Sequence, residues 1–362
     1  MMGRKLVIDA SIYREPASGV HLAVRNGVLA EVPFLQASFQ SLLIASFPPV
    51  PEVECMPLPT WAGTAVGRIF WQQCYLPRLL KKHEADLLHA EAYTMPLNCS
   101  LPVLLNVHDI IALEYPQWCS FQNVCHMRAL LPGSIRRAAK CLVPTRHVAQ
   151  RLQAVLGVPF RKIEIVPWGV DYQRFSTVSQ LLEFELPENY FLFVGNLEPK
   201  KNLEFLLKAY ADSAQQCQCA LVIIGRAGWK CTSLQQTLRN WSGPGQVRWL
   251  GRVPDPVVTA VYQKAKALIM PSLEEGFGLP ILEAMASGIP VLHSNHPALV
   301  EVAAGAGLAF SPYDSNELAD LMKNIAGNSA LREELRQAGQ QRAQKATWNN
   351  WGRQSANILQ NM

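Results

Sequence analysis

Two glutamates eight residues apart, Glu275 and Glu283, are the residues of this chain best suited to hold a sugar joined to a phosphate. Between them lie a glycine turn, Gly276–Gly278, and Pro280, which marks the start of a helix. The first N–H groups of a helix have no partner inside it and, together with the helix dipole, attract an anion. Carboxylates accept hydrogen bonds from hydroxyl groups, which phosphate oxygens do not offer. The pattern therefore predicts a site for a phosphorylated sugar.

Short apolar runs on both sides would hold these glutamates in place. Residues 265–272 (AKALIMPS) precede the glycine turn and residues 289–294 (IPVLHS) follow the helix, which Gly288 ends. Both runs are typical of buried parallel strands. The expected unit is a strand, a glycine turn, a helix and a second strand. The same pattern would fit an ordinary βαβ unit whose glutamates are merely solvated.

The segment EGFGLPILE resembles the E-x7-E motif of the retaining glycosyltransferases of family 4, which have the GT-B fold. The resemblance implies that Glu275 contacts the donor sugar and that Glu283 contacts the ribose of the nucleotide. It also implies that backbone N–H groups at the start of the helix hold the phosphate charge, and the residues concerned are Gly276, Phe277, Gly278 and Leu279.

A second loop, within Phe191–Asn202 (FLFVGNLEPKKN), places basic residues after an apolar strand and a glycine, Gly195. Family 4 usually has G-R-x-x-x-x-K here, and its Arg and Lys grip the diphosphate. Lys201 falls on the family's Lys, whereas Asn196 stands at the position of the Arg. Mannosyltransferase-like relatives of O-antigen synthesis have a small polar residue there and a basic one beside the Lys, as Lys200 is here. The other interpretation of the two lysines is an exposed pair at a helix start that Asn202 caps.

Two further strand-and-glycine segments, Leu221–Trp229 with Gly225 and Val247–Pro254, match the family in order and spacing. The resemblance therefore covers nearly the whole second half of the chain.

The first half carries fewer signals. Lys5–Ser11 predicts a first strand, and Gly19 follows it where the family has a glycine-rich loop near the donor phosphates. Leu101–Leu113 predicts a buried strand that runs into His108. In family 4 a histidine at this place contacts the transferred sugar, although a histidine after an apolar strand is often a satisfied core residue. Asp109 is expected to orient the local backbone.

Length and composition fit a two-domain α/β protein. The chain has 362 residues, 49% of them hydrophobic and 17% charged. With the resemblance, they predict two Rossmann-like domains of a GT-B fold with a cleft between them and a C-terminal helix crossing back to the first domain. The expected parts are residues 1–170 (acceptor-binding), 187–345 (nucleotide-sugar-binding) and 346–362 (the helix), with the boundary within Val166–Leu186.

The net charge of +5 is unevenly distributed, because no Asp or Glu lies between Glu114 and Glu164. That interval holds Arg128, Arg136, Arg137, Lys140, Arg146, Arg151, Arg161 and Lys162. A basic face can attract anionic lipid or a polyprenyl-diphosphate acceptor. A second candidate for membrane contact combines aromatic and basic residues, namely Trp61, Phe70, Trp71, Arg68, Arg78, Lys81 and Lys82. An ordinary basic surface with inward aromatics explains both as well, and no nucleic-acid recognition module is apparent.

No apolar run reaches the length of a membrane span, and the first residues lack a signal-peptide pattern, so we expect a cytoplasmic protein that could lie at the inner face of the membrane. The nine cysteines lack zinc spacing and are expected to be reduced, mostly core residues. The Asp-x-Asp motif of metal-dependent transferases is absent, so no cofactor or metal is expected to be required.

The resemblance implies a hexosyltransferase that moves a sugar, with mannose favoured, from a nucleotide-diphosphate donor to a saccharide or lipid-linked saccharide in surface polysaccharide (lipopolysaccharide) synthesis. The resemblance implies retention at the anomeric carbon, with His108, Glu275 and Lys201 as the catalytic residues. GDP-mannose is the favoured donor, although related loops also serve UDP- and dTDP-sugars. The alternatives are a GT-B nucleotide-sugar 2-epimerase and a nucleotide-sugar-binding partner without catalysis. A dehydrogenase would need a G-x-G-x-x-G that Val7–Gly19 does not supply.

Overall fold

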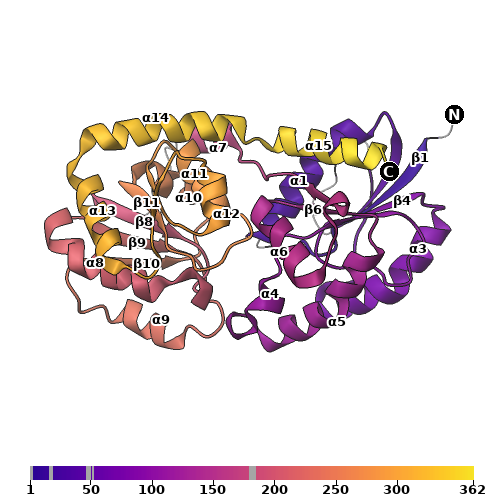
Figure 1. Cartoon of the computed structure of the whole chain (residues 1–362), viewed down its shortest axis with the longest axis horizontal. Helices are drawn as coiled ribbons and strands as arrows, with labels where there is room; N and C mark the ends of the chain where they lie inside the picture. Colours follow the sequence, from indigo (N-terminus) through magenta and orange to yellow (C-terminus); the bar gives the residue numbers. More distant parts are fainter. Residues whose placement is uncertain (1–2, 16–18, 46–49, 51–52, 179–184) are drawn as a thin grey trace. The chain divides into compact units, whose positions relative to one another are not determined.

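The computed structural model describes residues 3–15, 19–45, 50, 53–178 and 185–362 (Figure 1). The chain divides into two compact units, one made of Met1–Trp168 with Trp348–Met362 and the other of Gly169–Thr347. Each is described by itself. Ser18, beside the predicted glycine loop, and residues 179–184 of the predicted linker lie outside the described residues.

The first unit is built on a seven-stranded parallel sheet with the order β3-β2-β1-β4-β5-β6-β7. Its strands are β1 (Arg4–Asp9), β2 (Phe39–Ile44), β3 (Glu54–Met56), β4 (Leu87–Ala90), β5 (Val103–Asn106), β6 (Lys140–Val143) and β7 (Ile163–Ile165). The order reverses between β1 and β4, and the carboxyl ends of these strands lead to Asp9 and Glu91. The predicted first strand is confirmed as β1, and the strand predicted over 101–113 is shorter, since it ends at Asn106.

Helices surround this sheet, and the longer ones bury apolar residues against it. They are α1 (Val20–Leu35), η1 (Thr60–Gly63), α2 (Ala65–Phe70), η2 (Trp71–Tyr75), α3 (Leu76–Lys82), α4 (Ile111–Glu114), η3 (Pro116–Trp118), α5 (Phe121–Arg137), α6 (Arg146–Leu156), η4 (Phe160–Lys162) and α15 (Trp348–Gln360). Helix α15, yellow in Figure 1, packs against α1. A Cβ atom on Gly27 would lie 3.0 Å from the buried ring of Trp351, so a glycine is needed for this close packing.

The second unit contains a six-stranded parallel sheet with the order β10-β9-β8-β11-β12-β13. Its strands are β8 (Tyr190–Val194), β9 (Ala220–Ile224), β10 (Val247–Gly251), β11 (Ala267–Met270), β12 (Val291–Ser294) and β13 (Leu308–Phe310). Its helices are α7 (Tyr172–Ser176), η5 (Pro199–Lys201), α8 (Leu203–Cys217), α9 (Thr232–Arg239), α10 (Asp255–Lys264), α11 (Leu279–Ala286), α12 (Pro297–Ala303), α13 (Ser315–Gly327) and α14 (Ser329–Lys345).

The sequence pattern explains this second sheet. β8, β9, β11 and β12 are short, mostly apolar runs that are buried almost throughout, as expected for parallel strands with helices on both faces. α8, α9 and α13 pack on a core that includes Phe193, Leu206 and Leu318, while α11 packs against β11 and β12. The prediction of two Rossmann-like α/β domains is confirmed by the two parallel sheets.

Three local expectations need correction. Asn202 stands at the N-cap position of α8 but makes no capping bond, since its φ is 57° and its side chain donates to the carbonyl of Pro312 at 3.0 Å. Trp71 and Arg68 are buried and do not belong to an exposed amphipathic face, whereas Tyr75 is exposed. The π-helical turn over Trp71–Tyr75 shifts the side chains out of the 3.6-residue period, which places Trp71 in the core.

The cysteines agree with the expectation in most respects. All nine cysteines are free, and Cys74 and Cys125 are exposed, unlike the expected core residues.

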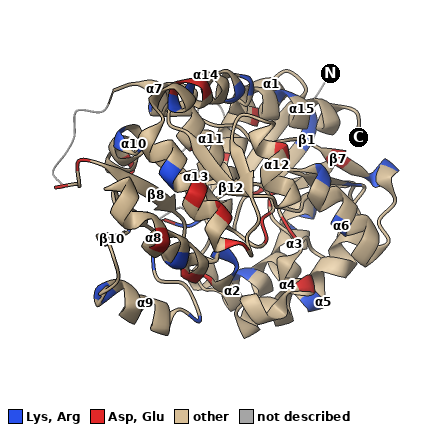
Figure 2. Ribbon diagram, turned by 60° about the vertical axis from the view of Figure 1, so that its left-hand side comes forward, with Lys and Arg blue, Asp and Glu red and all other residues tan. Residues whose placement is uncertain are grey.

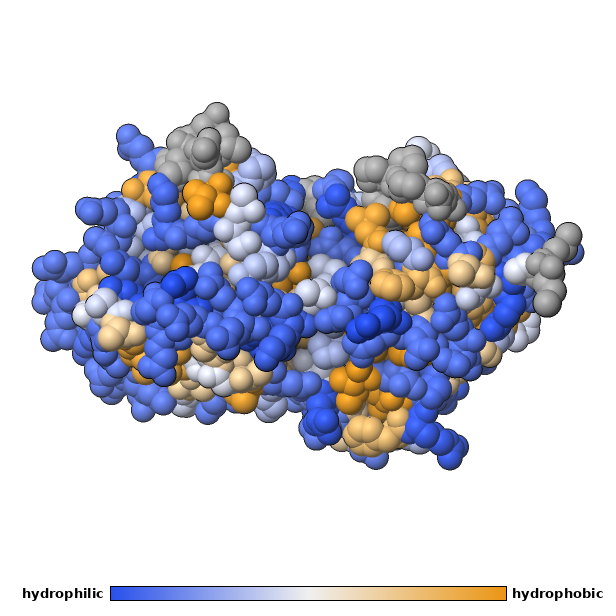
Figure 3. Space-filling model, turned by 90° about the horizontal axis from the view of Figure 1, so that it is seen from above, coloured by the Kyte–Doolittle hydropathy of each residue, from blue (hydrophilic) through white to orange (hydrophobic). Residues whose placement is uncertain are grey.

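Hydrophilic residues predominate on the face shown in Figure 3. Among the described residues, no helix has the length and apolar character needed to cross a membrane.

Candidate active site

The residues singled out in the second half of the sequence meet at one place in the second unit. The strand order of its sheet reverses between β8 and β11, and ligands of open α/β sheets bind at the carboxyl ends of strands where the order reverses. The loop after β8 carries Gly195–Lys201 and the loop after β11 carries Pro271–Gly278. The amide of Leu273 donates to the carbonyl of Lys200 at 2.8 Å, which ties the two loops together.

Lys201 and Glu275 form an ion pair in this position. The two side chains are mostly buried, with exposed fractions of 14% and 9%. Burial alone would raise the pKa of the Glu275 carboxyl, but the charges of Lys201 and Lys200 outweigh it and hold the pKa below the ordinary value. The pair is therefore ionised at neutral pH. Its ammonium can turn to a phosphate and its carboxylate to sugar hydroxyls.

Lys200 and Asn196 surround a further buried carboxylate that the sequence did not single out, Glu198. Nζ of Lys200 lies 3.9 Å from Oε2 of Glu198. Burial raises the pKa of Glu198, against the lowering effect of both lysines and of a hydrogen bond with the side chain of Asn196. Asn196, at the position of the family's Arg, thus interacts with a neighbouring carboxylate in the same loop. The spacing of Glu198 three residues before Lys201 was the available signal.

Glycines let the backbones of these loops approach. A Cβ on Gly225, which follows β9, would lie 1.8 Å from the carbonyl oxygen of Gly195, which follows β8. Gly278 precedes α11 with a φ of 99°, and a Cβ there would come within 2.6 Å of the Leu299 side chain. Phe277 and Leu279 on either side are buried. The predicted turn and helix start from Gly276 to Leu279 are therefore present.

Glu283 lies on α11 and is held from α10. The hydroxyl of Tyr262 donates to Oε2 of Glu283 at 2.8 Å. Burial raises the pKa of Glu283, while the hydrogen bond from Tyr262 and the charge of Arg174 lower it in part. Tyr262 was not predicted, because it lies 21 residues before Glu283 in a segment without a motif.

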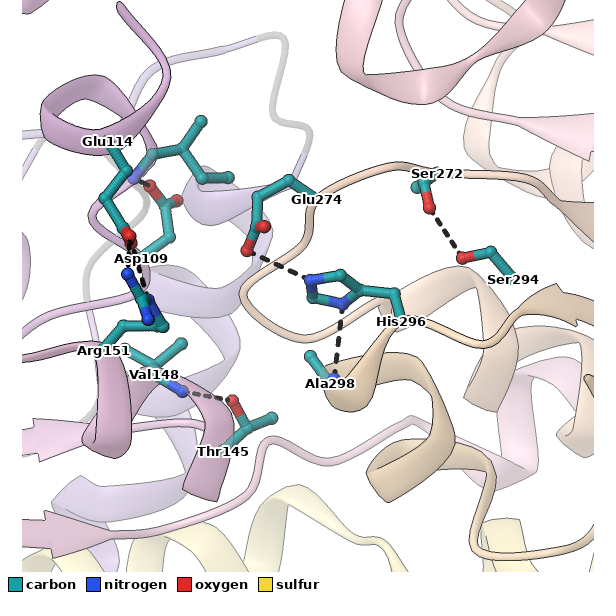
Figure 4. A network of polar contacts seen from close by, with 11 residues as sticks. Asp109, Glu114, Thr145, Val148, Arg151, Ser272, Glu274, Ser294, His296 and Ala298 are labelled. Atoms are coloured by element: carbon teal, nitrogen blue, oxygen red, sulfur yellow. Dashed lines mark hydrogen bonds and ion pairs between the residues drawn. The ribbon is translucent and has the colours of Figure 1, made fainter. Parts of the chain in front are cut away.

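A second polar pair follows β11 and β12 of this unit. Nε2 of His296 lies 3.1 Å from Oε1 of Glu274, and Nδ1 of His296 accepts from the amide of Ala298 at 3.3 Å (Figure 4). Since Nδ1 accepts a hydrogen bond, the proton of the ring lies on Nε2, toward the carboxylate. The hydroxyl of Ser294 donates to the carbonyl of Ser272 at 2.6 Å, which joins the ends of β12 and β11. Sequence reasoning did not identify either contact.

In the first unit, His108 follows β5 and is buried. Its Nε2 lies 2.8 Å from the carbonyl oxygen of Glu91, and its ring contacts those of Tyr93 and Trp168. Because a carbonyl only accepts, Nε2 carries the proton and Nδ1 is the acceptor. Burial lowers the pKa of His108 to about 4, so the ring is neutral at pH 7.

Asp109 and Gly19 complete the predicted residues of this unit. Oδ1 of Asp109 accepts from the amide of Ile111 at 3.0 Å, as drawn in Figure 4, and Oδ2 accepts from the hydroxyl of Tyr93. Asp109 therefore orients local backbone. Gly19 precedes α1 with a φ of 53°, and no atom lies within 4 Å of the place of a Cβ. The structure thus groups Lys201, Lys200, Asn196, Gly195, Gly225 and Glu275 in one unit, with Glu283 on α11, and holds His108 and Gly19 in the other.

Known proteins share both halves of this arrangement. Residues 40–174 match the family model described as Glycosyltransferase Family 4, and residues 177–342 match the one described as Glycosyl transferases group 1. The chain is similar to the O-antigen chain mannosyltransferase RfbU of Salmonella typhimurium, with 32% identity over 68% of this chain and 67% of that protein. It is 28% identical to O-antigen chain mannosyltransferase B of Escherichia coli, over 77% of this chain and 75% of that one.

Solved structures support the fold. Sucrose-phosphate synthase from Thermosynechococcus elongatus superposes with a TM-score of 0.81 at 20% identity over 99% of both chains. WaaG, a glycosyltransferase of lipopolysaccharide biosynthesis, superposes with a TM-score of 0.75 at 17% identity over 98% of this chain and 99% of that one. These neighbours have the GT-B fold, which confirms the predicted fold class. With the matched family models and the similarity to RfbU, they show that the chain belongs to glycosyltransferase family 4.

Proposed function

We propose that this glycosyltransferase moves mannose from GDP-mannose to a lipid-linked saccharide of a surface polysaccharide, with retention at the anomeric carbon. The ion pair of Lys201 and Glu275, at the point where the strand order reverses, carries the proposal. It joins a cation for the diphosphate to a carboxylate for the sugar. The choice of mannose rests on the names of the two O-antigen mannosyltransferases that the chain resembles.

In the proposed reaction, the bond between the anomeric carbon and the diphosphate oxygen breaks as the acceptor oxygen bonds to the same face of that carbon. The leaving diphosphate takes the proton of the acceptor hydroxyl, so no enzyme nucleophile is needed. Lys201, Lys200 and the N–H groups of residues 276–279 would stabilise the charge that develops on the diphosphate. These groups take the place of a metal ion in the proposal.

The remaining residues would position the donor. Glu275 would accept hydrogen bonds from sugar hydroxyls and Glu283 from the ribose. A hydroxyl of the transferred sugar would donate to Nδ1 of His108, which is the acceptor of a neutral ring. A neutral histidine adds no positive charge beside the oxocarbenium-like sugar, and so does not oppose its formation.

We further propose that the protein acts in the cytoplasm, in peripheral contact with an anionic membrane that presents the acceptor. Trp61, Phe70 and Tyr75 are exposed and form a cluster with ring centroids 5.2 to 6.2 Å apart. The guanidinium of Arg78 lies over the Tyr75 ring at 5.7 Å. Aromatic rings beside cations suit the headgroup region. Basic residues, blue in Figure 2, also occur on α5 and α6.

Sedimentation with vesicles tests the membrane contact. Full-length protein should bind vesicles that contain anionic lipid, and Trp61→Ala with Phe70→Ala should reduce that binding about tenfold. Tyr313→Ala, at an exposed aromatic residue of the other unit, is the matched control. Equal binding by the double variant and the control would rule this surface out.

A thermal-shift screen against GDP, UDP, dTDP, ADP and their mannose or glucose donors tests the transferase. We expect stabilisation by one nucleotide that Lys201→Met abolishes, because a ligand of the folded state raises its stability. NMR of the product from the matching donor would give the anomeric configuration. Nucleotide binding without sugar transfer to any acceptor would favour a non-catalytic binding partner. Conversion of the donor sugar to its 2-epimer without transfer would favour the 2-epimerase. No shift with any nucleotide would contradict the proposal.

A further inference from the structure

Three side chains of the first unit turn polar atoms toward one another in a fully buried place. Glu31 comes from α1, His89 from β4 and Glu91 from the residue after β4. Their exposed fractions are 0%, 0% and 1%. Nδ1 of His89 lies 3.1 Å from Oε2 of Glu31 and 3.5 Å from Oε1 of Glu91. One donor atom of each residue lies within 4.8 Å of the others.

The atoms on the outer side of this cluster have hydrogen-bond partners, whereas the atoms that face one another have none. Oε2 of Glu91 accepts from the side-chain amide of Asn106 at 2.6 Å, and the oxygen of that amide lies 3.1 Å from Nε2 of His89. By contrast, Nδ1 of His89, Oε1 of Glu91 and both carboxylate oxygens of Glu31 make no hydrogen bond. Four buried atoms without a hydrogen bond thus face one another, and all four are acceptors when the imidazole is neutral. Unsatisfied buried polar atoms are rare and costly, so such a group needs a partner.

Asn106 also sets the state of the imidazole. Because its NH2 group donates to Glu91, its oxygen must accept, and Nε2 of His89 therefore carries a proton. In the neutral ring this leaves the lone pair on Nδ1, which points to the two carboxylates. A hydrogen bond from the far nitrogen of a histidine to a polar side chain is the usual outer support of a metal-binding histidine.

The distances also suit a metal ion. Charged hydrogen bonds are about 2.7–2.9 Å long. Ligands about 2.0–2.1 Å from a tetrahedral zinc ion lie about 3.3–3.4 Å from one another. The separations of 3.1 and 3.5 Å bracket the second value. A divalent cation would also balance two carboxylates that have no ion pair with a lysine or arginine among the described residues.

We propose that Glu31, His89 and Glu91 bind a divalent transition-metal ion, with Zn²⁺ as the best fit to one nitrogen and up to three carboxylate oxygens. The ion is structural. It fastens α1 to the end of β4 and fixes Glu91, whose carbonyl accepts from His108. The site is separate from Lys201 and Glu275, so it does not depend on the proposed function.

Metal analysis of the full-length protein, produced without a histidine tag, tests the site. Protein refolded from urea with Zn²⁺ and then dialysed should hold about one ion per chain, since a buried ion exchanges slowly. Refolding with a chelator should lower the melting temperature by about 5 °C or more, and Zn²⁺ should restore it on a second refolding. Co²⁺ in place of Zn²⁺ should give the visible absorption of a four-coordinate site with nitrogen and oxygen ligands.

Glu31→Gln and His89→Gln should each lower the bound metal at least tenfold. His83→Gln and Glu54→Gln remove the same chemical groups outside the cluster and should leave it unchanged. The proposal would be overturned if the refolded protein held no metal and its melting temperature were the same with Zn²⁺ and with chelator. Full metal content in the cluster variants would overturn it as well. If those variants fail to fold, the refolding of the wild-type chain still decides.

Discussion

At the scale of single residues, the pair of Lys201 and Glu275 depends on a balance of electrostatic effects. Burial favours the neutral form of Glu275, and the lysines favour the ionised form and prevail. Breaking a buried pair costs more than the pair contributes, because the remaining charge stays out of water without its partner. The pair thus connects the proposed donor site to the stability of the second unit.

Lys201→Met should make this link measurable through pH. In the wild-type chain the pKa of Glu275 is lowered, so its stabilising contribution is present above the ordinary carboxyl pKa and is lost as the pH falls through the lowered value. In the variant, burial raises the pKa of Glu275 above that of the unfolded chain, so the penalty is greatest at neutral pH and disappears as the pH falls. Urea unfolding should show a loss of about 3 kcal/mol at pH 7 and much less at pH 4.

Lys323→Met is the control for this change, since Lys323 pairs with the exposed Asp320 at 3.0 Å on α13. We expect it to cost less than about 1 kcal/mol at pH 7. A Lys201→Met penalty that is the same at both pH values would show that the lost stability comes from packing and not from charge.

Tyr262 offers a second prediction at this scale. Tyr262→Phe removes the hydrogen bond to Glu283 and leaves a buried carboxylate with one partner fewer, so stability should fall by about 1–2 kcal/mol and nucleotide affinity about tenfold. Tyr190→Phe removes a similar bond, from its hydroxyl to the carbonyl of Val261 at 2.7 Å. It should cost similar stability and leave the affinity unchanged. Calorimetric titration with the nucleotide distinguishes the two variants. Equal nucleotide affinities would show that Glu283 does not contact the donor.

At the scale of elements, the two loops after β8 and β9 approach each other closely through backbone atoms. The Cβ added by Gly225→Ala would meet the carbonyl of Gly195 at 1.8 Å, so one loop has to move. We expect urea unfolding to show a loss of about 2–4 kcal/mol, together with weaker nucleotide binding. Gly327→Ala, in α13 with open space at its Cβ, should change stability by less than about 1 kcal/mol. Equal effects of the two substitutions would show that the loops adapt freely.

The strands and helices were easier to predict from the sequence than the side-chain contacts between them. The strands before Gly195 and Gly276 could be predicted because a short apolar run that ends at a glycine is too short for a core helix and is typical of a buried strand. The strand order then brought Lys201 to Glu275, as the resemblance implied. The alternatives for Trp71 stayed open because the regular helical period does not continue through the π-helical turn.

Side-chain partners from distant segments left no local signal. Tyr262 lies on α10 and Glu31 on α1, and each finds its carboxylate or imidazole partner only after the sheet has formed. The segment HAE at the end of β4 has no metal-ligand spacing by itself, since its third donor lies 58 residues before His89. Periodicity predicts which face of a helix is buried, but not that a buried face carries a glutamate such as Glu31.

At the scale of the whole molecule, the first unit is completed by the last residues of the chain. Trp351 of α15 fills the place that Gly27 of α1 leaves open, and a Cβ on Gly352 would lie 2.2 Å from the carbonyl of Ala30. The side chain of Gln360 donates to the carbonyl of Phe34 at 3.0 Å. Helix α1 therefore needs residues more than 300 positions away to bury its outer face.

Removal of Trp348–Met362 should therefore damage the unit that contains the N-terminus and spare the unit next to it in sequence. Loss of the buried Trp351 side chain alone should lower the free energy of unfolding by about 3–5 kcal/mol, which is much of the stability of an average domain. Hydrogen-exchange mass spectrometry should show that α1 loses its protection in the truncated chain while β8 keeps its own. Removal of only Asn361 and Met362 is the control and should change neither. Unchanged protection of α1 in the longer truncation would mean that this helix is held by the sheet alone, whereas loss at both α1 and β8 would mean that the two units unfold as one.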